Sequence, residues 1–145
     1  MKDPSLWEAI REEAESAFET DPVTGERELN LQKVLVLPLL QSVYIETLRL
    51  HVSVNVTREV VAETTTMAGY QLPKHALIQA PTRIAHYDEK VWGVDDHPAS
   101  EFWAFRNIKY STVEENGKEK QTFKFVMGAG PNEYFPYGMR AAIPP

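Results

Sequence analysis

The sequence predicts an α+β protein in which helices come first, a small antiparallel β region follows and an irregular meander comes last. Apolar residues recur at helical intervals through the first third of the chain. Residues 52–80 change to alternating and β-branched runs, which are typical of strands. Beyond Arg106 the regular period fades, which predicts irregular structure.

The first predicted helix is amphipathic and starts at Ser5, which has the capping-box spacing to Glu8. Its apolar positions at helical intervals are Leu6, Trp7, Ile10, Ala14, Ala17 and Phe18. A turn is expected at residues 21–25, where Pro and Gly interrupt the pattern. Asn30 is expected to cap a short helical turn that reaches Leu35.

The second predicted helix runs from Pro38 to Leu50, with an apolar stripe that includes Leu40 and Tyr44. Strand runs are then expected at residues 52–67 and 76–80, paired antiparallel through a turn at residues 71–75.

Two shorter segments complete the prediction. Residues 82–87 are expected to form one helical turn. Residues 112–121, which are rich in charge around Asn116 and Gly117, are interpreted as a solvated loop.

Composition excludes several classes of protein. The formal net charge is -6 without a Lys/Arg run, so no nucleic-acid partner is expected. No stretch approaches the roughly 18 apolar residues of a membrane span, and residues 1–5 do not begin a signal peptide. We therefore expect the chain as given to be cytoplasmic. The absence of cysteine excludes disulfides, thiolate nucleophiles and sulfur ligands for metals.

Glu46 and Arg49 lie three residues apart on the second predicted helix, a spacing at which their side chains meet. Such a pair alone is common on helix surfaces, but here other motifs follow it in order. They are Gly69-Tyr70-Gln71-Leu72-Pro73-Lys74, Ala85-His86-Tyr87-Asp88, Val91-Trp92-Gly93 and Glu101-Phe102-Trp103-Ala104-Phe105-Arg106. In this order and spacing the chain resembles the cytochrome P450 family over roughly residues 5–108.

The resemblance implies a partial cytochrome P450 fold with a buried structural triad of Glu46, Arg49 and Arg106. A carboxylate can accept hydrogen bonds from both guanidinium groups, so the triad would lock the helix to the later segment. The family usually has a proline and an acidic residue before the later arginine, where this chain has Ala104 and Phe105. The alternative is that Arg106 is an ordinary exposed arginine.

The family's cofactor is haem, and the resemblance implies that Arg58 pairs with a haem propionate. The alternative is that Arg58 is a solvated strand residue. His86 stands in the family's His-Arg-Asp-like stretch, with Tyr87 in place of arginine, and a structural histidine capping a turn is favoured over a cofactor contact.

The chain departs from the family at the iron ligand. Phe135-Pro136-Tyr137-Gly138 starts like the haem-binding loop, but no cysteine follows. In the family that cysteine thiolate is the axial ligand. None of the histidines stands where this ligand belongs; they are His51, His75, His86 and His97. The family's long distal helix would precede residue 1, so no catalytic residue and no metal ligand is assigned, and haem binding is doubtful.

These observations predict a truncated, inactive relative of haem-dependent monooxygenases that oxidise lipophilic small molecules with an NADPH reductase. Residues 1–108 would be the cytochrome P450-like C-terminal segment, and residues 109–145 a loop-rich tail that starts but does not complete the haem-binding loop. The family is often held at the endoplasmic-reticulum membrane by an N-terminal anchor.

Two other hypotheses remain open. One is a non-catalytic interaction module that binds a full-length relative or its reductase. The other is an unrelated acidic α+β domain in which the order of motifs arose by chance.

Overall fold

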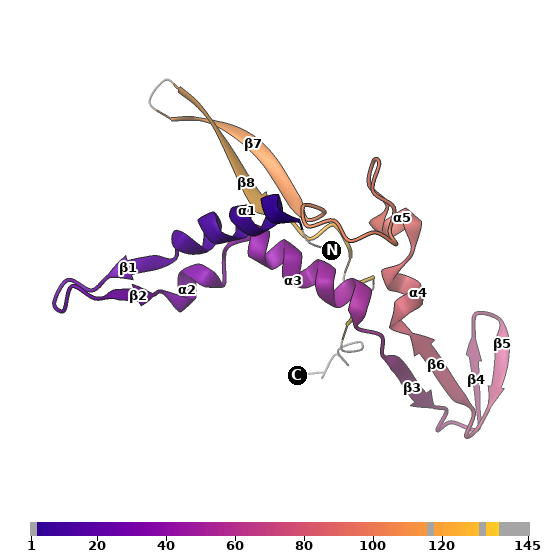
Figure 1. Cartoon of the computed structure of the whole chain (residues 1–145). Helices are drawn as coiled ribbons and strands as arrows, with labels where there is room; N and C mark the ends of the chain where they lie inside the picture. The colour runs from indigo at the N-terminus through magenta and orange to yellow at the C-terminus, as the bar shows by residue number, and fades with distance from the viewer. Residues whose placement is uncertain (1–2, 116–117, 131–132, 137–145) are drawn as a thin grey trace. The chain divides into compact units, whose positions relative to one another are not determined.

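A computed structural model of the chain describes residues 3–115, 118–130 and 133–136. Helices and short antiparallel strands both occur, so the α+β prediction is confirmed (Figure 1). The chain divides into two compact units. The first contains Met1–Thr47 and Glu101–Gly128, and the second contains Leu48–Ser100 and Ala129–Pro145.

The first unit begins with α1 (Pro4–Glu15), whose cap differs from the predicted one. Asp3, not Ser5, is the N-cap, and its carboxylate accepts from the amides of Ser5 and Leu6 at 3.0 and 3.2 Å. Pro4 occupies the first turn, where its missing N–H costs no helical hydrogen bond. The Ser5 hydroxyl and the Leu6 amide lower the pKa of Asp3, because both hydrogen bonds favour its charged form.

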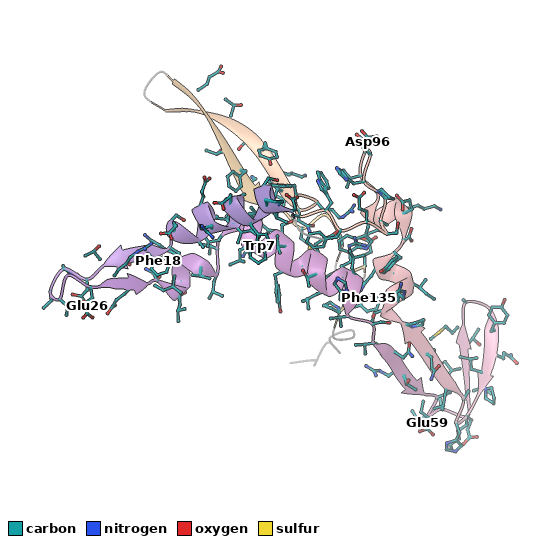
Figure 2. All side chains as sticks on the ribbon, in the orientation of Figure 1. Trp7, Phe18, Glu26, Glu59, Asp96 and Phe135 are labelled. Atoms are coloured by element: carbon teal, nitrogen blue, oxygen red, sulfur yellow. The ribbon has the colours of Figure 1, made fainter. Side chains whose placement is uncertain are left out.

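A hairpin of β1 (Phe18–Thr20) and β2 (Arg27–Leu29) follows, where the sequence predicted only a turn (Figure 2). Phe18 therefore belongs to a strand and not to the first helix. The turn itself is confirmed: Asp21 and Glu26 pair through their backbones, and Gly25 has a φ of +72°, which favours glycine.

The short helix α2 (Leu31–Val34) is capped by Asn30, as predicted, through a hydrogen bond from the Lys33 amide. The longer helix α3 (Pro38–His51) also agrees with prediction to within one residue. Helical periodicity did not predict its buried face, whose side chains are Leu39, Ser42, Glu46 and Arg49. The family resemblance did predict the burial of Glu46 and Arg49. Tyr44, on the predicted apolar stripe, is 56% exposed.

The first unit ends in a long hairpin of β7 (Ile108–Glu115) and β8 (Lys118–Phe125), paired antiparallel along its whole length (Figure 1). The solvated loop expected at residues 112–121 is therefore wrong. At the base of the hairpin, the Val126 amide donates to the Asn107 carbonyl at 2.8 Å, and the Asn107 amide donates to the Ser42 hydroxyl at 3.3 Å.

The second unit contains two antiparallel strand pairs (Figure 1). β3 (Asn55–Glu59) pairs with β6 (Leu77–Pro81), which confirms the predicted pairing of the two runs. Between them, β4 (Thr64–Met67) pairs with β5 (Tyr70–Pro73) around a tight turn at Ala68 and Gly69. Residues 71–73 are thus strand and not turn.

Two short helices complete the second unit. The predicted helical turn is α4 (Thr82–His86), and α5 (Glu89–Trp92) lies in the stretch that the sequence left without a helix. The Trp92 side chain is 2% exposed, and its indole N–H donates to the Ala85 carbonyl at 3.0 Å. Within the described ranges, no helix has the length and apolar character needed to cross a membrane.

Candidate functional site

Glu46 and Arg106 form an ion pair in the first unit. Arg106 Nε lies 2.9 Å from Glu46 Oε1, and the two side chains are 3% and 0% exposed. The Trp103 amide donates to the same carboxylate oxygen at 3.1 Å, and Arg106 Nη2 donates to the Glu101 carbonyl at 2.9 Å. Arg106 is therefore not the exposed arginine of the alternative interpretation.

The chain segment before Arg106 explains why this carboxylate can be buried. A charged group in the protein interior needs an opposite charge and further hydrogen bonds to replace its hydration. Here a turn at residues 103–106, closed by the Arg106 amide on the Trp103 carbonyl, presents both the guanidinium and the Trp103 amide to Glu46. The ion pair forms even though Ala104 and Phe105 stand where the family usually has a proline and an acidic residue.

Arg49 lies in the second unit and is fully buried. Its Nη1 donates to the carbonyls of His86 and Ala99 at 2.6 and 2.5 Å. The guanidinium carbon also lies 5.2 Å from the centre of the Trp92 ring, a cation–π distance. Arg49 thus connects α3 to the end of α4 and to the segment after α5.

Arg58 is exposed on β3, and its Nη1 donates to the neighbouring Thr57 carbonyl at 3.0 Å. An exposed guanidinium is available to an anion. Its role as a propionate partner stays a prediction.

The histidines test whether the chain can hold haem iron. His51 and His75 are exposed, and His75 Nδ1 lies 2.6 Å from Glu59 Oε1. His97 lies in a backbone bridge with Val94. His86 is fully buried, and its Nε2 accepts from the Phe135 amide at 3.2 Å.

The donor atoms present do not fit the family's haem site. The axial ligand of that site is a thiolate, and the sequence has no cysteine. In the described part of the chain, no group of three His, Asp or Glu side chains could hold a metal ion. Tyr137 and Gly138, which continue the loop-like motif, lie outside the described residues.

The surroundings of His86 displace its pKa. Burial lowers its pKa below the ordinary value, and the nearby Arg49 charge acts in the same direction. The backbone carbonyls of Arg49 and Val52 oppose this by favouring the protonated ring. Sequence reasoning treated His86 as a turn cap and missed its contact with Phe135, which is 49 residues further along the chain.

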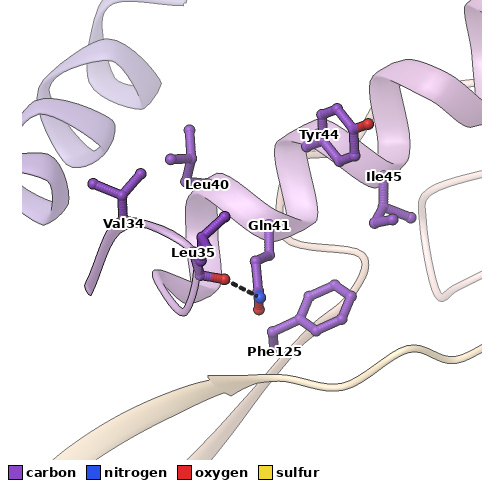
Figure 3. Close-up of a pocket in the computed structure, with 7 residues that line it drawn as sticks. All are labelled: Val34, Leu35, Leu40, Gln41, Tyr44, Ile45 and Phe125. Atoms are coloured by element: carbon purple, nitrogen blue, oxygen red, sulfur yellow. Dashed lines mark hydrogen bonds between the residues drawn. The ribbon is translucent and has the colours of Figure 1, made fainter. Parts of the chain in front are cut away.

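An apolar pocket of about 540 Å³ opens on the first unit (Figure 3). It is lined by Val34, Leu35, Leu40, Gln41, Tyr44, Ile45 and Phe125. Gln41 is the amide side chain of this lining, and it donates to the Leu35 carbonyl at 2.6 Å, while Tyr44 brings a phenol hydroxyl. The pocket therefore offers apolar contact without a charged group.

Comparisons with known proteins identify relatives of the whole chain. The family described as Cytochrome P450 matches residues 1–101, a range that includes Glu46 and Arg49 and ends before Arg106. Cytochrome P450 monooxygenase calL of Penicillium decumbens is 49% identical over 145 residues, which are 100% of this chain and 25% of that protein. Cytochrome P450 monooxygenase efuG of Hormonema carpetanum is 26% identical over 143 residues, or 93% of this chain and 25% of that protein. No solved structure matches the chain.

Proposed function

The chain belongs to the cytochrome P450 family, and from this premise we propose that it is a scaffold-bearing portion of a haem-dependent monooxygenase that by itself is inactive. It spans about a quarter of the length of the curated relatives it matches. An intact relative would oxidise a lipophilic small molecule with electrons from an NADPH reductase. The observation that carries the proposed inactivity is the absence of cysteine from all 145 residues, which leaves no thiolate for haem iron.

The structural part of the proposal concerns Glu46, Arg49 and Arg106. We propose that they act together as a scaffold, as in the family. Support comes from the buried Glu46–Arg106 ion pair and from the bonds of buried Arg49 to two distant carbonyls. All three hold α3 to segments that follow it by tens of residues.

Reconstitution with hemin tests the proposed inactivity. The purified chain, mixed with hemin, reduced and exposed to carbon monoxide, is expected to show no Soret band of the thiolate-ligated type. An intact cytochrome P450 treated in parallel provides the positive control for the spectrum. A thiolate-type band from this chain, or oxidation of a lipophilic substrate when reductase and NADPH are added, would contradict the proposal.

A second candidate function is a non-catalytic interaction module, favoured by the exposed apolar surface of the first unit. Leu35, Val36 and Tyr44 are 65%, 67% and 56% exposed, and Leu35 and Tyr44 line the apolar pocket. Exposed apolar patches of this kind commonly mark interaction sites. The partner proposed is a full-length relative or its reductase.

A binding assay with matched variants tests this second function. The tagged chain should retain a purified full-length relative or reductase, and Leu35→Asp should weaken retention by placing a charge in the apolar pocket. Val23→Asp is the control, because Val23 is 90% exposed in the β1–β2 turn and does not line the pocket. Equal retention by both variants, or none by the unmodified chain, would count against the module.

A further inference from the structure

His86 joins two segments of the second unit that are far apart in sequence. It is the last residue of α4, it is fully buried, and its Nε2 accepts from the Phe135 amide at 3.2 Å. The Tyr134 ring stacks on the imidazole with centroids 5.5 Å apart and planes 30° apart. The Phe135 ring lies 5.7 Å away, and Pro136 is buried. The His86 imidazole therefore contacts two successive residues. It packs against the rings of Tyr134 and Phe135, and it accepts a hydrogen bond from the Phe135 amide.

The hydrogen bond fixes the state of the ring. A nitrogen can accept a hydrogen bond only while it carries no proton, and an imidazolium ion has a donor on both nitrogens. If Nε2 were protonated, its N–H would face the N–H of Phe135, and the bond would be lost. Neutral His86 holds Phe135, and protonated His86 cannot hold it in the same geometry.

Charged and titratable neighbours act on this equilibrium from more than one element. From α3, Arg49 donates to the His86 carbonyl at 2.6 Å and brings a positive charge close to the ring. From the other side, Tyr134 contributes a phenol ring. Trp92 packs on Tyr134 with centroids 5.9 Å apart and carries no titratable group.

We propose that His86 is a positioning residue, whose neutral imidazole holds Tyr134, Phe135 and Pro136 in place and whose protonation releases them. Phe135 and Pro136 begin the motif that resembles the start of the haem-binding loop. The contacts of His86 with Tyr134 and Phe135 lie within the chain itself and do not require haem. Failure of this proposal is therefore distinguishable from failure of the proposed function, which the hemin experiment tests.

Hydrogen exchange at the Phe135 amide tests the proposal on the whole chain. Protection of this amide, corrected for intrinsic exchange, is expected to fall about tenfold for each unit of pH below about 6.5, the ordinary histidine pKa that the released ring regains, since one proton controls release. The His86 ring resonances should titrate over the same range. The Val60 amide, which donates to the Ala76 carbonyl at 2.9 Å, is the internal control and should keep its protection.

Two variants separate the hydrogen bond from the packing. His86→Gln places an amide oxygen near the position of Nε2, so it should protect Phe135 equally at pH 7.5 and pH 5. His86→Phe keeps an aromatic ring against Tyr134 but removes the acceptor, so protection should be low at both pH values. If His86→Phe does not fold, the pH dependence of Phe135 protection in the unmodified chain and in His86→Gln still tests the proposal. The proposal is overturned if Phe135 protection in the unmodified chain is independent of pH, or if His86→Gln retains the same pH dependence.

Discussion

Glu46 is the residue whose environment is hardest to explain without long-range structure. Its carboxylate is fully buried, and its partners at 2.9 and 3.1 Å come from Arg106 and Trp103, roughly sixty positions later in the chain. Burying a carboxylate is unfavourable unless a cation and further donors replace water, and this turn supplies both. The pair is therefore expected to stabilise the fold only while both members are present.

Replacing Glu46 with Ala should lower the free energy of unfolding by about 3–5 kcal/mol, because the Arg106 guanidinium would then be buried without its carboxylate. Urea denaturation of the purified chain measures this change. Glu63→Ala is the matched control, since Glu63 pairs with Lys74 at 2.7 Å with its side chain 84% exposed. A surface pair of this kind contributes about 0.2–1 kcal/mol. Equal losses in the two variants would show that the Glu46–Arg106 pair contributes no more than a surface contact.

His86 should make the stability of the chain depend on pH. Its pKa is lower in the folded state, chiefly through burial, so below the ordinary histidine pKa of about 6.5 the unfolded chain binds a proton that the folded chain does not. The free energy of unfolding should therefore fall as the pH decreases below this value. Urea titrations at pH 7.5 and pH 5.5 measure the loss, and it should be smaller in His86→Gln. The same loss in both proteins would assign the pH dependence to other groups.

At the scale of elements, the N-terminus of α3 donates hydrogen bonds to a side chain of another helix. The amides of Leu39 and Leu40 donate to the two carboxylate oxygens of Glu13 at 2.7 and 2.8 Å, and Glu13 belongs to α1. The first amides of a helix have no partner within the helix, and a negative charge there also favours the helix dipole. A side chain from α1 thus satisfies the N-terminus of α3.

Glu13→Gln should lower the free energy of unfolding by about 1 kcal/mol, because the amide retains one acceptor oxygen and loses the charge at the helix N-terminus. Glu12→Gln removes the same charge from an exposed neighbour and is the control. Thermal melting of both variants provides the comparison. Identical melting temperatures would show that the Glu13 carboxylate does not stabilise α3.

The β7–β8 hairpin lies where the charge pattern predicts a loop. Charged residues such as those around Asn116 and Gly117 are typical of a solvated loop. Asn-Gly is also a strong hairpin signal when strand-forming residues flank it. Tyr110 and Phe123 face each other in register with ring centroids 6.2 Å apart, and such cross-strand aromatic pairs stabilise a hairpin. Because both strands carry charged residues, the sequence pattern did not predict that they pair.

At the scale of the whole molecule, much apolar surface is left exposed. Exposed large apolar side chains of the first unit include Leu31, Leu35, Val36 and Tyr44, at 56–67% exposure. Exposed apolar surface favours association in water. The chain spans about a quarter of the length of its curated relatives, and residues at these positions can be covered in a longer protein.

The 145-residue chain should therefore associate with itself as its concentration rises, which sedimentation velocity measures. Tyr44→Ser should reduce this association, because it removes a large apolar contact from the rim of the pocket. Tyr70→Ser is a suitable control, since Tyr70 is 74% exposed in the second unit and does not line the pocket. Concentration-independent sedimentation of the unmodified chain would contradict the expectation.

The sequence by itself determined those features whose causes lie within a few residues. Period and caps located α3 and the Asn30-capped α2, the alternation of residues predicted the β3–β6 pair, and the missing cysteine removed the thiolate ligand. The order of the short motifs was sufficient to identify the resemblance to the cytochrome P450 family.

Helical periodicity alone could not predict which face of α3 is buried, although the family resemblance predicted the burial of Glu46 and Arg49. Helical periodicity favoured the apolar stripe with Leu40 and Tyr44, yet the fold buries Ser42, Glu46 and Arg49. A buried polar side chain is stable only with partners, and here the partners are the Asn107 amide, Arg106 and the carbonyls of His86 and Ala99. These groups are brought into place by segments 37 to 65 residues away, which no local pattern specifies.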